Sequence, residues 1–148
     1  MSLQQWQANG WLRPHSTNKR QISDLLAITD RDLADSSGEI SPDWQFGITY
    51  NAALKLCTIL LYASGYRPEK SLAHYRTLAS LPLILGQKYA TDSDYLDTCR
   101  AKRNTTEYDL AGMISQSEAD ELRAFTKELR TKVLDWLRHN HPELLPDS

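Results

Sequence analysis

The stretch from Ser41 to Gly65 constrains the fold of this chain more than any other part. Ser41 can cap a helix, Pro42 suits its first position, and apolar residues then recur at helical spacing up to Gly65. They cover so much of the circumference that this helix must lie at the centre of a bundle. The polar stripe that remains consists of Asn51, Lys55, Thr58 and Tyr62. We expect this stripe to face either solvent or a shared polar cleft.

Four other segments have the periodicity of amphipathic helices. They span residues 17–36, 72–85, 92–108 and 116–141. Pro82 interrupts the second of them, so we expect a kink or a restart near Leu81. Ser115 and Glu118 form a capping box that begins the last. Strand alternation, hairpin dipeptides and internal repeats are absent from the sequence, which therefore predicts an all-α fold, an up-and-down helical bundle of about five helices.

The length of 148 residues suits one domain, 1–148, in which residues 1–15 form an N-terminal arm docked by Trp6 and Trp11. The net charge is −2, so a contact with nucleic acid has to come from a local basic patch. The sequence shows neither a signal peptide nor 18 uninterrupted apolar residues, which predicts a cytoplasmic protein without a membrane span. Cys57 and Cys99 lie in apolar helical patterns, typical of buried thiols in a reducing cytosol rather than of a disulfide.

The segment from Arg100 to Tyr108 carries the densest group of chemically useful side chains. At helical spacing, one face would hold Arg100, Arg103, Asn104, Glu107 and Tyr108. Arg103 falls on the line that Leu96 and Cys99 mark as core-facing, and a charge on that line indicates a function. The alternative is an ion pair between Arg103 and Glu107 on a solvated helix face, which this spacing often produces.

Phosphate-binding glycine loops and the motifs of zinc proteases and serine hydrolases are absent, and the four histidines do not group. We therefore expect neither a cofactor nor a metal. His139 and His141 occur where a cation suits the end of a helix. His74 opens a helix just after the basic turn at Arg67, and it is either a hydrogen-bonded residue of the helix start or a member of the site.

Three pieces of the chain, in their order and spacing, resemble the HEPN superfamily of helical-bundle proteins. They are residues 51–65, residues 66–68 together with 71–74, and residues 103–108. The resemblance covers most of the chain from Ser41 to Gly112. It implies an up-and-down bundle that is usually dimeric. Many members are metal-independent endoribonucleases that act as toxins or in defence against phage, and others only bind nucleotides or partners.

The nuclease motif of that superfamily is an arginine, then a small polar residue, then after three more positions a histidine. Arg103 and Asn104 match it, but Tyr108 stands where the family has its catalytic histidine. A neutral imidazole can accept a proton from a ribose 2′-hydroxyl near pH 7, whereas a phenol with a pKa around 10 is the wrong group. Arg103 could clamp a phosphate, Asn104 could orient it, and Glu107 is the nearby group suited to act as a base. The resemblance therefore implies binding, with cleavage weak or absent.

The resulting hypothesis is a cytoplasmic homodimer whose cleft binds RNA or a nucleotide. The candidate catalytic residues are Arg103, Asn104, Glu107 and Tyr108, the candidate phosphate ligands are Arg67, Arg100, Lys102 and Arg103, and the cleft is completed by Asn51, Lys55 and His74. A hypothesis of another class is a non-catalytic dimerising module, the partner of a nucleotidyltransferase or an antitoxin, in which Arg103 and Glu107 hold the dimer together. A metal-dependent enzyme is disfavoured because the sequence has no ligand cluster.

Overall fold

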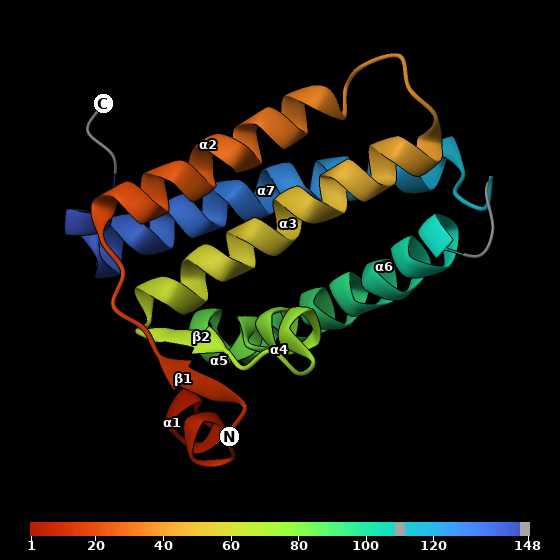
Figure 1. Ribbon diagram of the computed structural model, residues 1–148. Coiled ribbons are helices and arrows are strands. Elements are labelled where there is room, and N and C mark those ends of the chain that lie inside the picture. The colour runs from red at the N-terminus through yellow and green to blue at the C-terminus, as the bar shows by residue number, and fades with distance from the viewer. Residues whose placement is uncertain (109–111, 146–148) are drawn as a thin grey trace.

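A computed structural model describes residues 1–108 and 112–145, and the side chains of Thr106, Glu107 and Tyr108 lie outside that description. Four long helices form the body of the molecule: α2 (Lys19–Asp35), α3 (Pro42–Ala63), α6 (Ala90–Tyr108) and α7 (Gln116–Asn140). Figure 1 shows that they alternate in direction along the chain. The prediction of an all-α, up-and-down bundle is confirmed.

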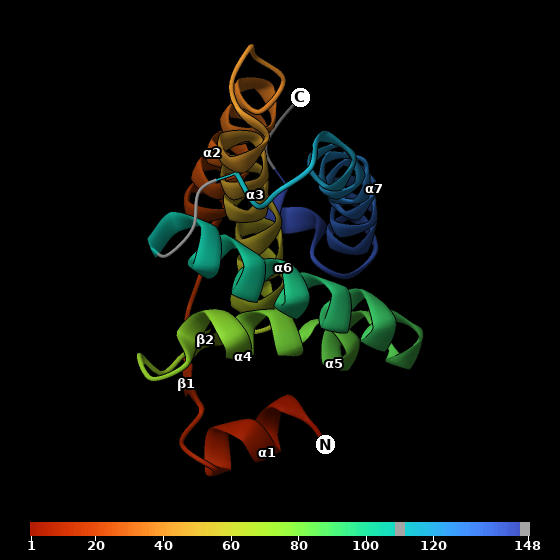
Figure 2. The same ribbon diagram turned by 90° about the vertical axis from the view of Figure 1, so that its right-hand side faces the viewer.

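The predicted central helix is the centre of the bundle. α3 packs most extensively on α2 and α7 and also contacts α6 (Figures 1 and 2). The fully buried side chains include Ile22, Tyr50, Leu56, Leu60, Leu96, Leu122 and Leu137, which α2, α3, α6 and α7 contribute. Burial of one such apolar side chain is worth about 1.5–3 kcal/mol, so this shared core is what fixes α3 in place.

Shorter elements connect and cover the long helices. They are α1 (Leu3–Ala8), β1 (Leu12–Pro14), β2 (Tyr66–Pro68), α4 (Ala73–Ala79), α5 (Leu81–Leu85) and the 3₁₀ turns η1 (Gln87–Tyr89) and η2 (Pro142–Leu144). α4 ends at Ser80 and α5 begins at Leu81, which confirms the restart predicted at Pro82. α4 lies beside α6, and this places the connecting segment next to the predicted site.

Local capping signals explain where the long helices begin. The Ser41 hydroxyl accepts from the backbone N–H of Trp44 at 3.3 Å. The Ser115 hydroxyl accepts from the N–H of Glu118 at 3.1 Å, and the Glu118 carboxylate accepts from the N–H of Ser115 at 3.1 Å, so the predicted capping box is present. The start of α2 was predicted one or two residues too early, because its cap is the Asn18 side chain, which accepts from the N–H of Gln21.

Two expectations from the apolar pattern are wrong. The sequence predicted no strand, yet β1 and β2 pair antiparallel in a short ribbon, with Leu12 opposite Pro68 and Arg13 opposite Arg67. Trp44 is the first residue of the apolar pattern after Pro42, which was expected to be buried, but it is 69% exposed, because the first turn of the helix buries Gln45 and Phe46 instead. In the N-terminal arm, Trp6 is buried in a small cluster with Leu12 and Leu61.

α3 is also long and apolar enough to cross a membrane, judged by length and composition alone, and within the described ranges it is the one helix that meets this test. One such helix is weak evidence for a membrane span, because the core helix of a soluble protein meets the same test. In the structure 61% of the apolar window of α3 is buried inside the bundle.

A cationic site between α3, α4 and α6

Arg103 lies against the central helix, as its position in line with two core residues predicted. A Cβ atom at Gly47 would stand 4.0 Å from its Cγ, so the aliphatic part of the side chain runs over the glycine at contact distance. Its guanidinium carbon is 5.6 Å from the centroid of the Tyr50 ring, within the range of a cation–π interaction. Gly47 and Tyr50 are three residues apart on α3, so the two contacts share one face of that helix. Arg103 remains partly exposed above them.

Arg100, one turn earlier on α6, is held by two neighbours. Its Nε donates to the Asp97 carboxylate at 2.8 Å, and its guanidinium carbon lies 5.8 Å from the centroid of the Tyr75 ring. Tyr75 belongs to α4, so Arg100 spans the space between α4 and α6. Asp97 offsets part of its charge, but the pair is partly exposed, and such pairs contribute little to stability.

His74 is the residue on which the nearby positive charges converge. It lies in the first turn of α4, after Leu72, whose φ of +58° turns the chain into the helix. Partial burial lowers the pKa of His74 below its ordinary value. The positive charges of Arg103, Arg100 and Lys55 lower it further. We call these four residues, Lys55, His74, Arg100 and Arg103, the cationic cluster. It is a local basic patch in a chain whose net charge is −2.

Tyr50 forms the floor below Arg103. Its side chain has no solvent exposure, and its hydroxyl has no hydrogen-bond partner in the described part of the chain. Burial raises the pKa of Tyr50 to about 12, although Arg100 and Arg103 act in the opposite direction. The phenol therefore stays neutral at physiological pH, and it offers the guanidinium of Arg103 an uncharged aromatic face.

The structure brings together only some of the predicted site residues. Arg100, Arg103, Lys55 and His74 meet in the cationic cluster, and Asn51 lies one turn before Lys55 on α3. Lys102 is directed elsewhere, because its ammonium donates to the Glu118 carboxylate of α7 at 2.5 Å. Asn104 is exposed on α6, and Arg67 is exposed on β2. The predicted roles of Glu107 and Tyr108 fall on side chains outside the described residues.

Sequence reasoning missed Tyr50 and Tyr75, the two rings beneath the arginines. Tyr50 follows the buried Phe46 by four residues and precedes the buried Cys57 by seven, a second apolar line on α3 that indicated its burial. Tyr75 is adjacent to His74 in the sequence, but its contact with Arg100 depends on how α4 packs on α6. No local pattern in the sequence contains that contact.

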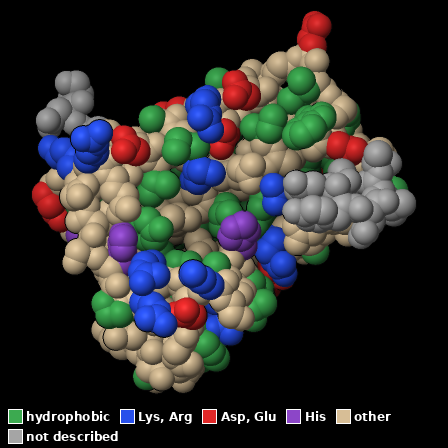
Figure 3. Space-filling view, viewed as in Figure 1, with side chains coloured by type: hydrophobic (Ala, Val, Ile, Leu, Met, Phe, Trp, Pro, Cys, Tyr) green, Lys and Arg blue, Asp and Glu red, His purple; other side chains and the backbone are tan. Residues whose placement is uncertain are grey.

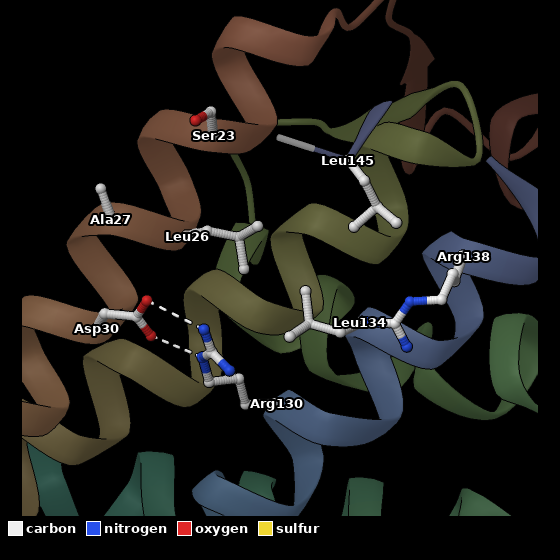
Figure 4. Close-up of a pocket in the computed structure, with 8 residues that line it drawn as sticks. All are labelled: Ser23, Leu26, Ala27, Asp30, Arg130, Leu134, Arg138 and Leu145. Carbon is white, nitrogen blue, oxygen red and sulfur yellow. Dashed lines mark hydrogen bonds and ion pairs between the residues drawn. The ribbon is translucent and has the colours of Figure 1, made fainter. Parts of the chain in front are cut away.

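Other parts of the molecule offer less for an anion. A hollow of about 620 Å³ lies between α2 and α7 (Figure 4). Arg130 donates there to both oxygens of Asp30, at 2.6 and 3.1 Å, and Arg138 is paired with Asp135. Acidic partners therefore already occupy the arginines of this hollow, whose floor is apolar.

The sulfur and metal chemistry considered from the sequence gives no competing site. Cys57 and Cys99 are free and buried, as predicted, and burial raises the pKa of their thiols to about 12 and about 11. Within residues 1–105 and 112–145, no three His, Cys, Asp or Glu side chains form a group that could hold a metal ion.

Comparison with known proteins adds no relative to this description. No protein-family model, no curated protein and no solved structure matches the chain.

Proposed function

We propose that the protein binds RNA or a nucleotide through the cationic cluster, with phosphate as the group recognised. The observation that carries the proposal is that Arg100 and Arg103 lie one turn apart on α6, over the rings of Tyr75 and Tyr50, with Lys55 and His74 near enough for the positive charges to act on the imidazole. Three like charges around one imidazole repel one another, and a phosphate placed among them would relieve that repulsion. Arginine suits this role because its planar fork can donate two parallel hydrogen bonds to phosphate oxygens.

The resemblance to the HEPN superfamily supports the same proposal, because Arg103 belongs to the motif that carries it. We further propose a cytoplasmic homodimer, as that resemblance implies, with a nucleotidyltransferase or an antitoxin as partner. Cleavage of RNA is the weaker part of the proposal, since Tyr108 replaces the expected histidine. The native chain should cleave RNA weakly or not at all in the presence of a chelator, and Tyr108→His should increase cleavage.

Binding is tested by fluorescence anisotropy of a labelled single-stranded RNA at low salt. A charge-assisted contact contributes about 1.5–3 kcal/mol, so Arg103→Ala should weaken binding by roughly 10- to 150-fold. Lys127→Ala is the matched control, because Lys127 is an exposed cation on α7. Figures 1 and 2 together show that α7 lies behind α3 in the view of Figure 1. The proposal is wrong if the native chain binds neither RNA nor nucleotides at low salt, or if both variants lose the same affinity.

A second candidate, the dimerising interaction module, is favoured by one apolar end of the bundle. The exposed side chains there are Ile40, Trp44 and Met113. Asp43 joins these segments, since its carboxylate accepts from the N–H groups of Gly112 and Ile114 at 2.6 and 3.3 Å. Burial of this end in a dimer would be insensitive to salt, whereas phosphate binding weakens steeply with ionic strength. Light scattering should then report about twice 16.9 kDa at both low and high salt.

A further inference from the structure

A continuous line of partly exposed side chains leads away from the cationic cluster along α3. From residue 49 to residue 63 every side chain of this helix is buried except four. These four are Asn51, Lys55, Thr58 and Tyr62, which we call the α3 stripe. Their spacing of four, three and four residues keeps them on one face. Lys55 belongs to the cationic cluster, so the stripe passes through that cluster and ends at Tyr62.

At its far end the stripe meets the β1–β2 ribbon. The His15 ring lies 4.2 Å from the Tyr62 ring, centroid to centroid. The N–H of His15 donates to the carbonyl of Gly65 at 2.9 Å, which extends the ladder of the ribbon by one bond. Side chains alternate along an extended chain, so Arg13 and His15 share the face opposite the buried Leu12.

Arg67 lies directly opposite Arg13 in the ribbon, and residues paired in this way project from the same face of an antiparallel ladder. Both arginines are exposed. The Glu69 carboxylate accepts a hydrogen bond from Arg13, and this pairing raises the pKa of Arg13 and lowers that of Glu69. The charge of Arg67 also lowers the pKa of Glu69, so the two arginines act on one carboxylate. We call Arg13, His15 and Arg67 the ribbon anchor.

The ribbon anchor is too far from the cationic cluster to contact the same phosphate. From Lys55 to Tyr62 is seven residues, about 10 Å at 1.5 Å per residue. From His15 to Arg13 adds roughly 7 Å of extended chain. The rise per nucleotide in a strand of duplex DNA is about 3.4 Å, so the two sites are several nucleotides apart.

We propose that the ribbon anchor is a second phosphate-binding site, and that a single strand of nucleic acid held at the cationic cluster runs along the α3 stripe to reach it. This inference rests on the proposed function and specifies its ligand as an oligonucleotide rather than a mononucleotide. Between the two sites, the paired rings of Tyr62 and His15 offer a face on which a base can stack, and stacking tolerates any sequence.

The charge distribution on this face agrees with such a path. Figure 3 shows Lys and Arg side chains gathered over the ribbon and beside α6, with histidine side chains near them and few acidic ones in between. Asp97 pairs with Arg100, and Glu69 pairs with Arg13. Removal of the Glu69 charge releases Arg13, so Glu69→Gln should strengthen binding of a long strand.

Strand length and single substitutions together test the proposal. Anisotropy or competition would compare a uridine mononucleotide with uridine oligomers of two, four and eight residues at low salt. Affinity should rise with length until both sites are filled. Arg67→Ala should weaken the octamer roughly tenfold, lower the slope of log K against log salt by about 0.7, and leave the mononucleotide unchanged. Arg103→Ala should weaken both ligands, and Lys127→Ala should weaken neither.

The outcomes separate this inference from the proposed function. If the mononucleotide and the octamer bind equally well, or if Arg67→Ala affects both to the same extent, the second site does not exist, although the cationic cluster still binds. Tight binding of a blunt duplex of the same length would refute the single-strand path. If neither ligand binds, the proposed function fails together with this inference. Circular dichroism checks that Arg67→Ala is folded. We expect it to be, because the side chain of Arg67 is exposed.

Discussion

The hydroxyl of Tyr50 gives the most quantitative test of how the site is built. A hydroxyl buried without a hydrogen bond costs about 1–3 kcal/mol in mutational data, and Tyr50 is fully buried with an unpartnered hydroxyl, as judged within the described residues. Tyr50→Phe keeps the ring and removes that cost. The void left is roughly 10 Å³, which at about 24 cal/mol per Å³ costs only about 0.2 kcal/mol. We expect a net stabilisation of about 0.8–2.8 kcal/mol.

Urea denaturation followed by circular dichroism measures this difference, and calorimetry checks it. For a chain of this size about 1 kcal/mol corresponds to about 2–4 °C, so the melting temperature should rise by about 2–11 °C. Tyr75→Phe is the control, because Tyr75 is exposed and its change should remain within about 0.5 kcal/mol. If Tyr50→Phe is less stable than the native chain by more than about 0.5 kcal/mol, the hydroxyl has a partner and the argument is refuted.

The same substitution also separates stability from binding. The face of the ring, which interacts with the guanidinium of Arg103, remains in Tyr50→Phe. RNA affinity should therefore stay within about twofold of the native value. A tenfold loss, about 1.4 kcal/mol, would instead show that the hydroxyl reaches the ligand.

Three further predictions follow from contacts described above. Because partial burial and then positive neighbours lower the pKa of His74, the free imidazole is mostly neutral at pH 7, and a bound phosphate would favour its protonation. RNA affinity should therefore rise as the pH falls from 8 to 5, and His74→Gln should flatten this dependence while His139→Gln does not. Ser115→Ala removes the hydroxyl of the capping box and should cost about 1 kcal/mol in urea denaturation, whereas Ser117→Ala, in the same turn, should cost much less. Since burial raises the pKa of Cys57 to about 12 and that of Cys99 to about 11, neither thiol should react with a disulfide reagent at pH 8 until the protein is unfolded; rapid labelling of the native chain would contradict their burial.

The sequence predicted the long helices because their signals are local. Ser41 and Ser115 are followed within three residues by the groups that they cap, and Pro82 restarts a helix through its own ring. The short ribbon carries no such signal. Its strands have three residues each, each contains a proline, and Leu12 pairs with Pro68 from more than fifty positions away. Only the packed structure specifies that pairing.

The candidate site was predictable in part for the same reason. The spacing of Arg103 to Leu96 and Cys99 predicted that it lies on the core-facing side of its helix, because these residues occupy one face of α6. The convergence of Lys55 and His74 on that arginine depends on how three helices pack. The separation of Lys102 from the group also depends on packing, since Glu118 belongs to α7.

The hydrogen bonds from Asp43 to Gly112 and Ile114 close a long loop, which separates the segment containing α4, α5 and α6 from the core of α2, α3 and α7. They join residues 69 and 71 positions apart, so the segment that contains α4, α5 and α6 leaves from the end of α3 and returns to its beginning. Closing a loop of that length costs about 4 kcal/mol of chain entropy. α3 packs far more extensively on α2 and α7 than on α6. We therefore expect two cooperative units, in which local opening of the α4–α6 loop exposes the arginine face of α6 while the three-helix core stays folded.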